Sequence, residues 1–192
     1  MPKRSIVRTP RLHRIPWKNG GGTTREVAVF PGGAGPDTFR WRLSLADIVK
    51  DAAFSNFRGT DRHFLLATPG NLSMVVDGAR RTAAYGRTEA FPGEADVSVK
   101  LSSGPTSVIN LITARADCTG DVSVDRLDGP LIPQPYAVAW ALLDGTAWDD
   151  SGEQLEPLDF LMCGPGAEGI HFNEALMATL FVLPRDKGGE QA

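Results

Sequence analysis

The sequence predicts an all-β protein, built as a sandwich or a barrel. Apolar residues recur mostly with a period of two, short apolar segments alternate with turn residues, and helix signals are weak. The segment 39–46, FRWRLSLA, shows the alternation most clearly, because its aromatic and leucine side chains face one way while Arg40, Arg42 and Ser44 face the other. Many short strands with turns at regular spacing are typical of sandwiches and barrels.

The expected strands follow one another along the whole chain. Segments 63–68 (HFLLAT) and 72–77 (LSMVVD) flank a Pro-Gly-Asn turn, which predicts a hairpin. Segments 97–103 and 106–114 flank a Gly-Pro turn and predict a second hairpin in the same way. The remaining expected strands are 122–127, 136–143, 158–163 and 176–183.

Two segments also have a helical interpretation. Residues 44–54 could hold one helical turn, and residues 172–179 (FNEALMAT) could form a helix capped by Asn173. We favour a strand for the second, because it leads into the apolar run 176–183. The acidic and polar stretch 144–157 is expected to be a loop.

Composition indicates a globular protein of the cytoplasm. The chain has 192 residues, 42% of them hydrophobic and 22% charged, which is enough to bury a substantial core. The net charge of −3 without a basic run argues against nucleic acid as a partner. No apolar run reaches the length of a membrane span, and the basic N-terminus lacks the apolar core of a signal peptide. Cys118 and Cys163 are expected to be reduced thiols.

The stretch 15–27, IPWKNGGGTTREV, contains three consecutive glycines that need an explanation. It is not a phosphate-binding P-loop, because Lys18 precedes the glycines, and no βαβ unit surrounds it. The glycines then serve either a tight turn that feeds the next strand or a close backbone approach to a ligand. The neighbouring ring, amide, hydroxyl and cationic groups favour a small carboxylate ligand. The predicted ligand residues in this stretch are Trp17, Lys18, Asn19, Gly20, Gly21, Thr24 and Arg25.

Three further polar residues lie on otherwise apolar strands. Arg42 and Ser44 form either an ordinary solvent face or, in a closed barrel, part of a lumen that binds an anion. Asn110 lies within the apolar segment 106–114, and a buried Asn must be hydrogen-bonded to the protein or to a ligand. We therefore add Arg42, Ser44 and Asn110 to the candidate ligand residues.

Signals for catalysis and metal binding are weak. His63 follows Asp61 and Arg62 directly, so the three side chains do not form an obvious triad, and Asp61 with Arg62 is interpreted as a structural pair. No HxH, HExxH or GxSxG motif occurs, so no metal and no cofactor are expected. If the protein is an enzyme, the candidates for a general acid or base are Glu26, Asp61 and His63.

Four blocks of the sequence together resemble the HutD/Ves family. They are PWKNGGGTTREV (16–27), FRWRLSLADI (39–48), the long segment 53–78 and INLITAR (109–115). The resemblance covers about residues 10–116. It implies a cupin (RmlC-like jelly-roll) β-barrel, in a bicupin-like arrangement with a second β lobe at about 117–185 of a single domain spanning 1–192. HutD-like members are associated with histidine utilisation, where binding of N-formylglutamate has been proposed, and Ves-like members with stress response.

The chain departs from related patterns at two places. Metal-dependent cupins carry an HxH motif, whereas RHFLLAT has one histidine, which speaks against metal-dependent chemistry. The family segment near 110 commonly contains an Asp two residues before the Asn, and here Val108 replaces it.

The leading hypothesis is a non-metal cupin that binds a small anionic metabolite, with a homodimer left open. Lys18, Arg25 and Arg42 would bind carboxylates, Trp17 would form an apolar wall, and hydrogen bonds would come from Asn19, Thr24, Ser44 and Asn110. The alternatives are a cupin-fold isomerase, lyase or hydrolase acting on a small acid, and a structural or protein-interaction module. We lean away from the enzyme, because no acid–base candidate has an evident partner.

Overall fold

A computed structural model describes residues 5–102, 104–132, 134–163 and 169–185. Within these ranges the chain forms sixteen strands, and the single helical element is the short 3₁₀ turn η1 (Thr9–Arg11). The prediction of an all-β protein is therefore confirmed. No helix of the described residues is long and apolar enough to cross a membrane.

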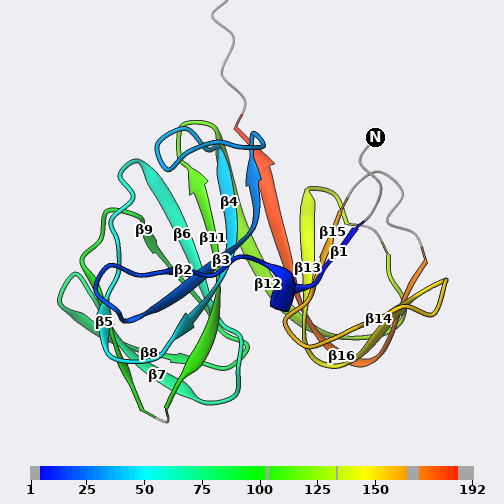
Figure 1. Cartoon of the computed structure of the whole chain (residues 1–192). Coiled ribbons are helices and arrows are strands. Elements are labelled where there is room, and N and C mark those ends of the chain that lie inside the picture. Colours follow the sequence, from blue (N-terminus) through cyan, green and yellow to red (C-terminus); the bar gives the residue numbers. More distant parts are fainter. Residues whose placement is uncertain (1–4, 103, 133, 164–168, 186–192) are drawn as a thin grey trace, which may run out of the picture.

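Two β lobes lie side by side in Figure 1. The first lobe consists of a six-stranded and a four-stranded sheet. The six-stranded sheet has the spatial order β2 (Ile15–Pro16), β3 (Gly22–Phe30), β4 (Trp41–Ile48), β11 (Thr106–Ala114), β6 (Thr60–Leu66) and β9 (Thr88–Pro92). The four-stranded sheet has the order β5 (Ala52–Ala53), β10 (Val97–Leu101), β7 (Asn71–Val76) and β8 (Ala79–Ala84).

The second lobe is built on long antiparallel strands, together with one strand from the start of the chain. Its sheet has the order β1 (Ser5–Val7), β15 (Phe160–Met162), β13 (Ala137–Asp149), β16 (Ile170–Pro184) and β12 (Cys118–Pro130), and β14 (Gln154–Leu155) pairs with β13. The N-terminal strand β1 therefore belongs to the second lobe, while β2 belongs to the first.

Three apolar cores follow from the alternation of side chains along the strands. Leu43 and Leu45 of β4 face the second lobe, where they join a core that includes Ala141 and Leu180. Ala46, on the opposite face of β4, packs inside the first lobe. A third core around Trp140, Phe172 and Met177 fills the second lobe. One face of β4 is thus sealed by the second lobe, while its other face looks into the first lobe.

Both predicted hairpins are wrong in their pairing. Strand β6 pairs with β11 and β9, whereas β7 pairs with β8 and β10, so the turn at 69–70 joins two different sheets. The turn after β10 likewise leads to β11 in the other sheet. Turn residues and flanking apolar runs are the same at a hairpin and at a corner between sheets, so local sequence does not distinguish them.

Two expectations in the second lobe have different outcomes. Residues 172–179 lie within strand β16, as favoured. The loop expected at 144–157 is instead partly strand, because β13 continues to Asp149 and β14 follows at Gln154–Leu155. Polar side chains face solvent on these strands, which gave the stretch the composition of a loop.

Candidate functional site

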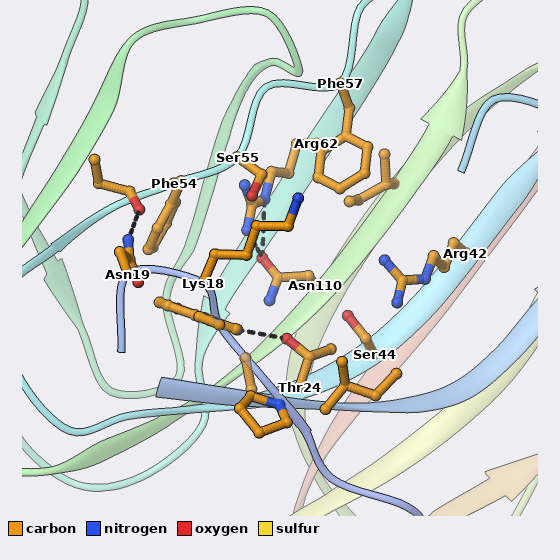
Figure 2. Close-up of a pocket in the computed structure, with 16 residues that line it drawn as sticks. Lys18, Asn19, Thr24, Arg42, Ser44, Phe54, Ser55, Phe57, Arg62 and Asn110 are labelled. Atoms are coloured by element: carbon orange, nitrogen blue, oxygen red, sulfur yellow. Dashed lines mark hydrogen bonds between the residues drawn. The ribbon is translucent and has the colours of Figure 1, made fainter. Parts of the chain in front are cut away.

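A cavity of about 500 Å³ lies in the first lobe, beside the inner face of the six-stranded sheet (Figure 2). The segments 15–19 and 53–57 form its other walls. Apolar and aromatic residues make up part of the lining, as is usual for small-molecule sites. The polar side chains that line it are Lys18, Asn19, Thr24, Arg42, Ser44, Ser55, Arg62 and Asn110.

Strand register brings the inner polar residues together. Ser44 of β4 lies opposite Asn110 of β11, and Arg42 lies opposite Ile112, which in turn lies opposite Arg62 of β6. Because alternate residues of a strand share a face, these positions all point to the inside of the lobe. Residues from three strands that are distant in sequence thus form one polar wall.

Arg62 is a buried cation at the inner end of this wall. Its side chain donates from Nε and Nη2 to Oδ1 of Asn110, over 3.0 and 2.8 Å, and the residue is 8% exposed. Its guanidinium carbon lies 4.6 Å from the ring centroid of Phe54 and 5.7 Å from that of Phe91. Burial, and secondarily the charge of Arg42, lowers the pKa of Arg62 to about 10, so it remains protonated at neutral pH.

No acidic side chain within the described ranges pairs with Arg62. A buried charge without a counter-charge is unfavourable, and buried charges are normally paired. The amide of Asn110 supplies only a dipole. The charge of Arg62 is therefore not balanced by an acidic side chain of the described residues.

Two more cations face the same cavity. Arg42 donates from Nε to Oε2 of Glu26 over 2.8 Å, and Figure 2 shows its terminal nitrogens turned towards Ser44 and the cavity. Lys18 is exposed and points into the cavity in the same view. It forms no ion pair with an acidic residue of the described chain. The cavity thus carries three cations and one nearby acid.

Trp17 and Asn19 shape the outer wall of the cavity. The indole Nε1 of Trp17 donates to Oγ1 of Thr24 over 2.8 Å, and the rings of Trp17 and Phe54 pack nearly perpendicular to each other, with 5.9 Å between their centroids. Asn19 accepts a hydrogen bond from the backbone of Gly21 and donates to the carbonyl oxygen of Ala53. The amide of Asn19 is therefore engaged in holding the turn against β5, although the residue lines the cavity.

The three glycines are needed by the turn itself. Gly20 and Gly21 were both predicted to contact the ligand, and neither of them lines the cavity. Gly20 has a φ of +66°, a Cβ on Gly21 would lie 2.4 Å from Cβ of Ala52, and a Cβ on Gly22 would lie 2.1 Å from the carbonyl oxygen of Asp47. The backbone at Gly21 and Gly22 thus makes a close approach to strands β5 and β4.

Arg25, which we predicted to bind the ligand carboxylate, lies outside the cavity. It follows Thr24 directly on β3, and consecutive residues of a strand face opposite sides. Its side chain is 7% exposed and donates from Nη2 to both carboxylate oxygens of Asp47, over 2.7 and 2.6 Å. Ser107 donates to the same carboxylate over 2.8 Å. Arg25 is therefore part of a structural ion pair.

We expect Arg25→Ala to lower the free energy of unfolding by about 3 kcal/mol, because the carboxylate of Asp47 loses its main partner and keeps only Ser107 and the more distant Arg14. Ligand affinity of the folded fraction should stay within twofold of the wild type. Denaturant titration and calorimetry below the unfolding temperature measure the two quantities. A large loss of affinity with unchanged stability would contradict this structural role.

Comparison with known proteins agrees with the architecture. The family model described as HutD matches residues 9–178. The chain belongs to the HutD family. It is 39% identical over 115 residues to an uncharacterized 21.2 kDa protein in the hutC 3' region of Pseudomonas putida, a match that covers 59% of this chain and 60% of that protein. It is 35% identical over 112 residues to protein Ves of Citrobacter koseri, over 56% of each chain. These matches thus span at most 60% of the curated relatives.

Solved structures cover nearly the whole of this HutD-family chain. HutD from Pseudomonas fluorescens SBW25 is 28% identical, with a TM-score of 0.78 over 95% of this chain and 99% of that one. A conserved protein of unknown function from Pseudomonas aeruginosa PAO1 is 29% identical, with a TM-score of 0.80 over 94% and 99%. A cupin 2 conserved barrel domain protein from Leptotrichia buccalis, 13% identical with a TM-score of 0.60 over 94% and 96%, shows the cupin-like β fold.

The acid–base candidates of this HutD-family chain are not gathered at the cavity. Glu26 is the one that comes near it, through Arg42. Asp61 pairs with Arg115 over 2.9 Å, not with Arg62 as we expected. Asp61 does not line the cavity.

His63 is the remaining acid–base candidate, and it lies on the other face of β6. A Cβ on Gly120 would lie 3.3 Å from its ring, so the side chain faces β12 of the second lobe and not the cavity. Burial lowers the pKa of His63, against the opposing charges of Asp121 and Asp61. No group of three or more His, Cys, Asp or Glu suited to a metal occurs in the part of the chain that the structure describes.

Sequence reasoning missed Arg62 and the aromatic segment around Phe54 and Phe57. The sequence contained a signal for Arg62: alternate residues of a strand share a face, and Arg62 alternates with the buried Phe64 and Leu66. A charged residue at an inward position of a strand requires a partner, and the same argument applies to the polar side chain of Asn110. No comparable signal marks Phe54 or Phe57, because they lie outside any periodic segment.

Proposed function

We propose that this protein binds a small carboxylate metabolite, of the N-formylglutamate type, in the cavity of the first lobe. The observation that carries the proposal is Arg62, a buried guanidinium that is bonded to an amide and has no acidic partner in the described chain. A carboxylate would supply the missing counter-charge. Guanidinium–carboxylate hydrogen bonds are among the strong charge-assisted ones in proteins.

The other lining groups fit a ligand with a second acidic end. One carboxylate would lie against Arg62 and the amide nitrogen of Asn110. The second carboxylate would reach Arg42 and Lys18, nearer the mouth of the cavity. Ser44 would supply an orienting hydrogen bond, and Trp17 with Phe54 an apolar wall for the carbon chain.

The family supports a link to histidine utilisation. A relative is described by its position in the hutC 3' region, and a structural relative is named HutD. We infer that the protein is a cytoplasmic, bicupin-like single domain spanning residues 1–192, which senses a pathway intermediate and regulates flux. The proposal involves neither nucleic acid nor a membrane, and a homodimer is compatible with it.

Binding without turnover is the activity that the cavity supports. The acid nearest to it, Glu26, is engaged with Arg42. The cavity of about 500 Å³ is larger than a packing defect, which supports a binding protein over a structural module.

Thermal unfolding against a ligand panel tests this proposal. The panel contains N-formylglutamate, glutamate, urocanate, histidine, formate, and divalent metals with a chelator control. A ligand at a hundred times its dissociation constant stabilises by about 2.7 kcal/mol, which for a chain of this size is a shift of roughly 5–10 °C. We expect such a shift with a dicarboxylate. The proposal would be refuted if none of the acids raised the unfolding temperature, or if only metals did.

A further inference from the structure

Glu26 occupies an irregular place at the edge of the cavity. It lies opposite Ser44 in the pairing of β3 with β4, and the register shifts between Glu26 and Ala28. A β-bulge of this kind re-aims a side chain and is frequent beside functional sites. The carboxylate of Glu26 accepts a hydrogen bond from Nε of Arg42 over 2.8 Å, while Glu26 itself does not line the cavity.

This contact leaves the terminal nitrogens of Arg42 available to a ligand, while the carboxylate of Glu26 offsets the charge of Arg42. A guanidinium has one Nε–H and two terminal nitrogens, so a bond at Nε fixes the plane of the group and leaves its terminal N–H donors free. Figure 2 shows these terminal nitrogens turned towards the cavity. The side chains of Arg42 and Glu26 are 20% and 40% exposed, so the pair is only partly screened by solvent.

The cavity therefore presents an uneven set of charges. Arg62 and Lys18 have no acidic partner within the described ranges, whereas the charge of Arg42 is balanced by Glu26. Two uncompensated cations match a ligand with two carboxylates. A third carboxylate on the ligand would have no free counter-charge and would lie near the anion of Glu26, an arrangement that is repulsive.

We propose that Glu26 is a specificity-determining residue, which orients Arg42 and offsets its charge so that the cavity selects dicarboxylates over tricarboxylates. This inference rests on the proposed function and adds to it a rule for the number of carboxylates. Attraction is thus combined with a repulsive element, which is how binding sites commonly obtain specificity.

The test compares glutarate with tricarballylate, which has three carboxylates, by calorimetry at fixed ionic strength. Glu26→Gln keeps an acceptor for Nε of Arg42 and removes the charge. We expect the wild type to prefer glutarate, and Glu26→Gln to shift the ratio of the two dissociation constants about tenfold towards tricarballylate. The matched control is Glu89→Gln, which removes the acid of the pair Arg81–Glu89 outside the cavity and should leave the ratio unchanged. Circular dichroism verifies that both variants are folded.

Each outcome decides a different claim. An unchanged ratio in Glu26→Gln, with both acids still binding, would overturn the role of Glu26 and leave the proposed function intact. A wild type that binds tricarballylate at least as tightly as glutarate would also overturn it. If neither acid binds to the wild type while N-formylglutamate gives a thermal shift, the role of Glu26 is overturned and the proposed function stands. If N-formylglutamate gives no shift either, both fail.

Discussion

Arg62→Met is expected to weaken the binding of N-formylglutamate or glutarate by 100-fold or more, which is about 2.7 kcal/mol. Methionine fills part of the space of Arg62 but removes every donor and the charge that lies over the ring of Phe54. The ligand carboxylate would then be buried without a counter-charge. Calorimetric titration of the two acids into the folded variant measures the loss.

Stability of the ligand-free protein should respond in the opposite direction. A cation whose pKa is lowered by burial binds its proton less strongly in the folded state, so its charge destabilises the fold at neutral pH. Arg62→Met removes this unfavourable charge, and we expect the free energy of unfolding to be unchanged or about 1 kcal/mol higher.

Arg80→Met is the matched control for Arg62→Met. Arg80 is exposed on β8 and lies outside the cavity, so this variant should change neither affinity nor stability. Full affinity in Arg62→Met would refute the account, and so would collapse of its fold.

Gly22→Ala is expected to lower the free energy of unfolding by about 4 kcal/mol or more, an effect at the upper end for single substitutions. The added Cβ would lie 2.1 Å from the carbonyl oxygen of Asp47, which is backbone and not a flexible side chain. Strands β3 and β4 would have to separate where Gly22 pairs with Ile48. Denaturant unfolding, followed by tryptophan fluorescence, measures the change.

Gly32→Ala provides the comparison within the same part of the chain. Gly32 lies in the loop after β3, and an added Cβ would meet nothing within 4 Å. We expect its effect to stay within about 0.5 kcal/mol. Equal effects of Gly22→Ala and Gly32→Ala would mean that close strand contact is not the reason for the glycines.

Much of the fold could be predicted because its signals are local. The period-two pattern of β4 correctly separated Leu43 and Leu45 from Arg42 and Ser44. The pairing of the strands could not be predicted, because it depends on residues far apart in the sequence. The turn between β6 and β7 has the residues of a hairpin and joins two sheets, because partner choice depends on register between strands far apart in sequence.

The site could be predicted in part for the same reason. Trp17, Lys18 and Thr24 line the cavity, whereas Arg25, adjacent to Thr24, does not. Alternation along a strand separates two neighbouring residues, but it does not say which of them faces inward. Arg62 required knowledge that β6 lies beside β11, because only that pairing brings it to Asn110.

A crystal structure of the protein grown with saturating N-formylglutamate is the most direct test of the central claim. We predict a ligand carboxylate oxygen at about 2.7–3.2 Å from a terminal nitrogen of Arg62, with the carbon chain against Trp17 and Phe54 and the second carboxylate near Arg42 and Lys18. An acid bound elsewhere on the protein, or a cavity that holds only water at saturation, would contradict it.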